Sequence, residues 1–126
     1  MKNLFTNEEF GMLLLHMNIM RNSIKKGFKK SYGRNEGKEK LSVYDSIITN
    51  LNDSLEIYGE KEYYDTDLNY AQIDMLDSFI NFYVDKLEQQ AAGEKINHEG
   101  NETFLILNSV KEKVKVVVNE NIAHQI

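Results

Sequence analysis

Cysteine, proline and tryptophan are all absent from this sequence of 126 residues. Without cysteine the chain has no disulfide framework, no thiolate ligands for zinc and no thiol nucleophile. Without proline it also lacks the residue that most often interrupts a helix, because proline has no backbone N–H and its ring clashes with the preceding turn. The composition therefore permits long helices.

Long apolar runs are missing as well, and the apolar residues Ile24 and Phe28 of the basic segment 21–40 continue the core stripe of the first helix, so we expect no contact with membranes. Residues 1–9 lack the apolar core of a signal peptide, and no later run approaches the ~20 residues needed to cross a bilayer. We therefore expect a cytoplasmic protein. With 41% hydrophobic and 28% charged residues the composition is globular, and the length suits a single helical domain spanning residues 1–126.

The three histidines do not form a metal-binding pattern. His16, His98 and His124 are scattered along the chain, and none has a glutamate three residues before it. That Glu-x-x-His spacing is the one by which helical bundles hold metal ions. We therefore expect neither a metal site nor a cofactor.

Motifs for catalysis are missing too. Neither the Gly-x-Ser-x-Gly signature of a serine nucleophile nor a glycine-rich phosphate loop occurs in the sequence. Distant carboxylates such as Asp65 and Asp67 can in principle share acid–base work, but acidic residues between helices more often act as caps or solvated charges. We therefore expect no enzymatic activity.

End signals place the first helix near the N-terminus. Thr6 and Glu9 have the spacing of a capping box, and the apolar residues that follow recur with helical periodicity as far as Phe28. This helix should end near Gly33. Residues 31–40 are polar and contain two glycines, which predicts a loop.

Three further helices are expected. The second runs from about residue 40 to a capping glycine at position 59, and the third from about residue 67 to residue 93. Residues 101–122 are rich in β-branched residues and fit either a terminal hairpin or a helix capped by Asn101, which we favour. The fold class is therefore all-α, a small antiparallel bundle of about four helices.

Charge is segregated along the chain, although the net charge is only −5. Residues 21–40 carry eight Lys and Arg against two Glu, a net +6, whereas residues 41–80 carry nine Asp and Glu against one Lys, a net −8. The two segments can pair within the protomer, which we favour, or the first can form an electrostatic docking site. The candidate docking residues are Lys25, Lys26, Lys29, Lys30 and Arg34.

The same basic segment, residues 21–40, suggests an alternative function in nucleic-acid binding. Its cations can neutralise phosphates, and Phe28 and Tyr32 can stack on bases. A helix-turn-helix is not indicated, because the loop expected after the first helix is too long. The acidity of the whole chain counts against nucleic-acid binding in general. We therefore rank nucleic acid below protein as a partner.

Two apolar surfaces are candidates for protein contacts. The helical wheel places Met12, Leu15 and Ile19 opposite the main apolar face of the first helix, so they form an interface to a homodimer or partner unless another helix covers them. Four tyrosines near the second connection form an aromatic contact patch or, as we favour, are partly buried at one end of the bundle. They are Tyr58, Tyr63, Tyr64 and Tyr70.

By elimination, the sequence favours a small acidic interaction protein that regulates or inhibits another protein. Its Asn- and Lys-rich, proline-free character is similar to that of many short proteins of low-GC Gram-positive bacteria and their phages. This resemblance of style suggests a phage- or prophage-encoded regulator.

Overall fold

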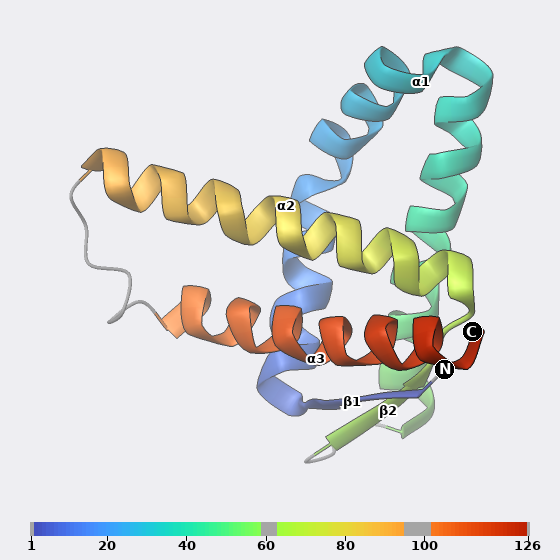
Figure 1. Ribbon diagram of the computed structural model, residues 1–126, viewed down its shortest axis with the longest axis vertical. Coiled ribbons are helices and arrows are strands. Elements are labelled where there is room, and N and C mark those ends of the chain that lie inside the picture. The colour runs from blue at the N-terminus through green and yellow to red at the C-terminus, as the bar shows by residue number, and fades with distance from the viewer. Residues whose placement is uncertain (1, 59–62, 95–101, 126) are drawn as a thin grey trace.

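The computed structural model describes residues 2–58, 63–94 and 102–125, which form three helices and one two-stranded sheet. Figure 1 shows their arrangement. The predominantly helical class predicted from the sequence is confirmed. The elements, in chain order, are β1 (Lys2–Thr6), α1 (Asn7–Tyr58), β2 (Tyr63–Asp67), α2 (Tyr70–Glu94) and α3 (Glu102–Gln125).

Helix α1 is bent at Gly33 into two arms, which we call the first arm (residues 7–32) and the second arm (residues 34–58). Gly33 has φ 83° and ψ −177°, a conformation that is open essentially to glycine alone. Figure 1 shows that the two arms run in opposite directions. The loop predicted over residues 31–40 is therefore wrong, because a single glycine reverses the chain and helix continues on both sides of it.

The two arms approach closely near the bend because Gly37 has no side chain. A Cβ atom at this position would lie 3.1 Å from the carbonyl oxygen of Phe28 and 3.2 Å from the Cα atom of Lys29. Those distances are shorter than ordinary van der Waals contacts. The polar residues that suggested a loop are instead the exposed residues of this helical tip.

Helices α2 and α3 form a second pair that packs on α1. In Figure 1 this pair crosses the arms of α1 rather than running alongside them, so the antiparallel four-helix bundle is not confirmed. The C-terminal segment is a helix, as favoured over a hairpin. The predicted cap Asn101 and most of the loop expected before it lie outside the described residues.

The small sheet was not predicted. Strands β1 and β2 pair antiparallel, with Lys2 opposite Asp67 and Thr6 opposite Tyr63. Helix α2 consequently starts later than expected, after a second capping box in which the Asn69 side chain accepts a bond from the Gln72 backbone N–H and the Gln72 side chain accepts one from the Asn69 N–H, both at 2.9 Å.

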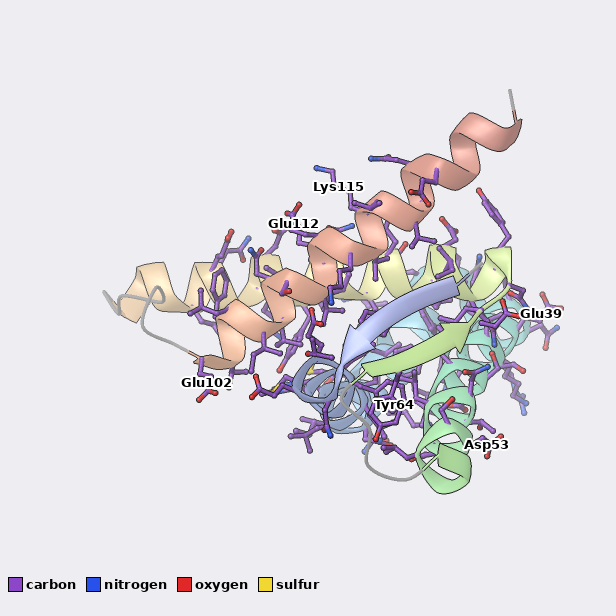
Figure 2. The ribbon with its side chains drawn as sticks, turned by 90° about the horizontal axis from the view of Figure 1, so that it is seen from below. Glu39, Asp53, Tyr64, Glu102, Glu112 and Lys115 are labelled. Atoms are coloured by element: carbon purple, nitrogen blue, oxygen red, sulfur yellow. The ribbon has the colours of Figure 1, made fainter. Side chains whose placement is uncertain are left out.

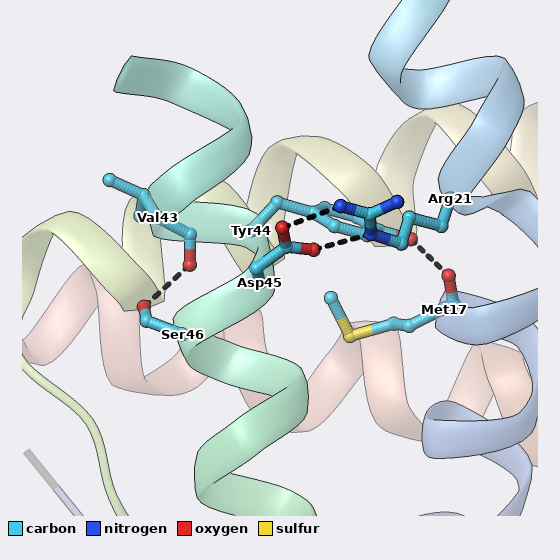
Figure 3. Close-up of polar contacts among 6 residues, drawn as sticks. All are labelled: Met17, Arg21, Val43, Tyr44, Asp45 and Ser46. Carbon is cyan, nitrogen blue, oxygen red and sulfur yellow. Dashed lines mark hydrogen bonds and ion pairs between the residues drawn. The ribbon is translucent and has the colours of Figure 1, made fainter. Parts of the chain in front are cut away.

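One hydrophobic core joins all these elements. Phe10 stacks on Tyr64 of β2 with ring centroids 4.3 Å apart, which ties the first arm to the sheet. The Tyr44 hydroxyl donates to the Met17 carbonyl oxygen at 2.6 Å, joining the two arms (Figure 3). Fully buried side chains come from both arms and from α2 and α3, among them Leu13, Ile47, Leu51, Ile73, Leu76, Ile80, Leu107, Val110 and Val114.

A buried carboxylate, Glu9, holds α3 against the start of α1. The predicted capping box is confirmed: Glu9 accepts from the Thr6 N–H at 2.9 Å, and the Glu9 N–H donates to the Thr6 hydroxyl at 3.2 Å. From α3, the Ser109 hydroxyl donates to Glu9 Oε2 at 2.7 Å and the Lys113 ammonium donates to Oε1. Glu9 is only 4% exposed, so the three hydrogen bonds that its carboxylate accepts replace its contacts with water.

The environment of Glu9 favours its charged form. Burial alone would raise the pKa of Glu9, but the Lys113 ammonium and the bonds from Thr6 and Ser109 outweigh burial and lower the pKa below the ordinary value of 4.5. A carboxylate with a depressed pKa stabilises the fold above its unfolded-state pKa, and this contribution is lost as the pH falls through the folded-state pKa.

We predict that Glu9→Gln lowers the free energy of unfolding at pH 7 by roughly 1–3 kcal/mol. Glutamine can still serve the capping box, so the variant removes mainly the charge that faces Lys113. The difference from the unmodified protein should shrink below pH 4.5, where the glutamate is protonated in the unfolded chain. Urea denaturation at several pH values measures it.

Glu112→Gln is the matched control, because Glu112 is exposed on the outer side of α3 (Figure 2). Its effect should stay within about 0.5 kcal/mol at every pH. An equal loss of stability in both variants would contradict the role assigned to Glu9.

Candidate functional site

An open apolar groove lies between the first arm of α1 and helix α2, and we call it the α1–α2 groove. Its volume is about 310 Å³. The first arm contributes Met20, Ser23, Ile24, Gly27, Phe28, Ser31 and Tyr32, the second arm contributes Tyr44, and α2 contributes Met75, Ser78, Phe79, Phe82 and Lys86.

The groove exists because the arms of α1 extend beyond the helices that cover them. Figure 1 shows the bend of α1 standing clear of α2 and α3. The apolar stripe of the first arm nevertheless continues past the core, through Ile24 to Phe28, and these two side chains remain half-buried. Gly27 widens the groove, since it has no side chain and nothing lies within 4 Å of where a Cβ would be.

Aromatic rings form a firm wall on the α2 side. Phe79 stacks on Tyr83 with centroids 5.6 Å apart and meets the edge of Tyr44 at 5.7 Å. Burial raises the pKa of Tyr44, so this phenol stays neutral and bonded to the Met17 carbonyl. Phe82 stands at the rim with 53% of its surface exposed.

Two cations border this apolar surface. The Lys86 ammonium lies 6.0 Å from the centroid of the Phe82 ring, and the Lys40 ammonium lies 5.3 Å from that of Tyr32. Both contacts have cation–π geometry, which keeps the ammonium groups close to the rings. The groove therefore combines an apolar floor with positive charge beside two of its lining residues.

The polar side chains that line the groove are serines, tyrosines and one lysine. The serine hydroxyls come from Ser23, Ser31 and Ser78, and no histidine or carboxylate is among the lining residues described. His16 does bond to Tyr83, with Nδ1 2.6 Å from the hydroxyl, and burial lowers the pKa of His16. This pair does not line the groove, and it links the first arm to α2.

Within the described ranges, no three His, Cys, Asp or Glu side chains are grouped closely enough to hold a metal ion.

Only part of the basic segment, residues 21–40, pairs with the acidic segment that follows it. Arg21 forms a two-pronged ion pair with Asp45 across the arms, at 2.7 and 2.8 Å (Figure 3). Hydrogen bonds from Arg21 lower the pKa of Asp45. The predicted docking residues are exposed, and none of them forms an ion pair with another described residue. They are Lys25, Lys26, Lys29, Lys30 and Arg34.

Three of these docking residues meet in a second, smaller pocket between the two arms, which we call the basic pocket. Lys25, Lys29 and Arg34 line it together with Lys38, which the sequence did not single out, and its volume is about 140 Å³. Gly37 and Leu41 complete the lining. Lys26 and Lys30 are exposed but do not line this pocket.

The predicted apolar stripe on the first arm is largely exposed. Leu15 and Ile19 keep 54% and 59% of their surface accessible, and no described helix or strand covers them. Met12 is different, because it is half-buried and packs against the edge of the core.

The four tyrosines do not form one exposed patch. Tyr64 is fully buried in the core, whereas Tyr70 is exposed at the start of α2, so neither is partly buried as the favoured interpretation expected. The side chains of Tyr58 and Tyr63 lie outside the described residues.

Together these features define a small helical protein with an open apolar groove, a basic pocket and an exposed apolar stripe. No helix in the described part of the chain is long and apolar enough to cross a membrane. Compared with known proteins, the chain matches no protein-family model, no curated protein and no solved structure. Function is therefore inferred from the geometry and chemistry of these surfaces.

Proposed function

We propose that this protein is a non-enzymatic interaction module that binds an amphipathic helix of another protein in the α1–α2 groove. The observation that carries the proposal is the groove itself, where half-buried and exposed apolar side chains from two helices face one open space. These side chains offer an apolar surface, with the exposed Phe82 ring at its rim, that another protein can cover. By binding that helix, the module would regulate or inhibit the partner protein.

A helix is the occupant that fits best, because the groove is itself bounded by two helices. A third helix can insert its apolar ridge between the first arm and α2, as helices do when ridges pack into grooves. Such ligands present anchors at positions i, i+3, i+4 and i+7, and the exposed Phe82 ring supplies a large aromatic surface for them.

The flanking cations favour acidic residues on the bound helix. Lys40 and Lys86 lie against rings of the groove, where a carboxylate from a partner can pair with either ammonium. The chain as a whole is acidic, with a net charge of −5, so positive charge at the groove is a local feature. These two cations would select a helix by its charge pattern and set its register.

We predict that helical peptides selected for binding to the protein from a random display library are amphipathic, with acidic residues beside their apolar face. Phe82→Ser should weaken their binding by about 1–3 kcal/mol, roughly a 5- to 150-fold increase in Kd, because it removes an aromatic anchor. Calorimetric titration measures the Kd.

Val116→Ser is the control, since Val116 on α3 is 55% exposed and lies outside the groove. It should leave the Kd unchanged. Equal binding to both variants, or peptides without an apolar face, would contradict the proposed site.

Nucleic-acid binding is the second candidate function, and the basic pocket is the observation that favours it. Four cations surround one small space there, and the lining residues include no carboxylate. The mutual repulsion of these cations would be relieved by an anion such as a phosphate of DNA or RNA.

Gel-shift titration with random duplex and single-stranded DNA and RNA tests this second function. Binding through the basic pocket should have a Kd below about 100 µM at physiological salt and weaken steeply as salt rises. The double variant Lys25→Ala/Lys29→Ala should then bind more weakly than Lys26→Ala/Lys30→Ala, which removes equal charge outside the pocket. No shift, or equal losses in both variants, would reject it.

A further inference from the structure

The exposed face of the first arm of α1 is a continuous stripe that runs along several turns. At 100° per residue, its members fall within an arc of about 80° on the side opposite the core. All are exposed except Met12, which is half-buried. From residue 8 to residue 26 the stripe consists, in chain order, of Glu8, Met12, Leu15, Ile19, Asn22 and Lys26, and the exposed Lys30 continues it toward the bend.

This stripe is complementary to itself. When two copies of a helix pair antiparallel about a twofold axis that passes at the level of residue 17, residues equally far before and after that level meet at the same height. Leu15 then lies beside Ile19 of the other copy and Met12 beside its Asn22. At each end, Glu8 meets Lys26.

We propose that the protein forms a symmetric homodimer through this stripe, with the two first arms antiparallel. In the single chain Leu15 and Ile19 are each more than half exposed. The dimer would shield this apolar centre from water. The ends would carry two opposite-charge pairs, since the acidic residue lies at one end of the stripe and the basic residue at the other. A parallel arrangement would place like charges together.

The homodimer is independent of the partner helix proposed above. None of the six stripe residues lines the α1–α2 groove, which opens on a different side of the same arm. Dimerisation would therefore leave both grooves open and make the module bivalent. One stripe from each copy is a small contact, so the association should be weak and reversible.

Sedimentation velocity of the full chain over a range of concentrations tests the dimer. We expect reversible dimerisation with a Kd below about 1 mM. Leu15→Ser/Ile19→Ser should abolish it, whereas Leu105→Ser/Val116→Ser, which replaces two equally exposed residues of α3, should leave it intact. Circular dichroism establishes that each variant remains folded.

A charge exchange gives the sharper test. Glu8→Lys and Lys26→Glu should each weaken the dimer roughly tenfold, because each turns two attractive pairs into repulsive ones. Combining both substitutions should restore the dimer, since the pairs form again with their signs reversed. A monomer at every concentration, equal losses in the two serine variants, or no recovery in the combined variant would overturn the proposal.

Discussion

The buried Glu9 carboxylate is the interaction on which the arrangement of the helices depends. It closes the capping box at the start of α1 and at the same time bonds to Ser109 and Lys113, a hundred residues farther along the chain. A carboxylate that is 4% exposed costs several kcal/mol if its partners are removed, so α3 is fixed against the start of α1. Helix α2, which packs on α3, is fixed with it.

The α1–α2 groove follows from that placement. Because α3 is anchored at the start of α1, the α2–α3 pair covers the lower part of the two arms and leaves their upper part uncovered (Figure 1). The arms stay together there through Arg21 with Asp45 and through the close approach at Gly37. The apolar stripe of the first arm is longer than the part that α2 and α3 cover, so its upper part stays open to solvent.

Local signals in the sequence predicted the features that depend on neighbouring residues alone, namely helical segments and their ends. The Thr6–Glu9 capping box, the end of the first helical run at Gly33 and the helical C-terminal segment are all present in the structure. The sheet was missed because its strands are five residues long and pair across about sixty residues of chain. Residues 31–40 were mistaken for a loop because their polarity reflects exposure at a helical tip.

The sequence was less informative about the sites. Leu15 and Ile19 are exposed, as one of the two interpretations of their stripe required. The groove was not foreseen, because periodicity shows that Phe79 and Phe82 lie on apolar sides of α2 but not that Phe79 is covered and Phe82 exposed. The partners of Glu9 and the convergence of Lys38 with Lys25 depend on tertiary contacts that no local pattern contains.

Site-specific photo-cross-linking in the source cells tests most directly whether the groove is the partner-binding site, with benzoylphenylalanine placed at Phe82 and, as a reference, at Val116. The account predicts that position 82 alone cross-links to one protein and that the attachment maps to the apolar face of an acidic amphipathic helix, whereas equal cross-linking from both positions, or none from position 82, would contradict it.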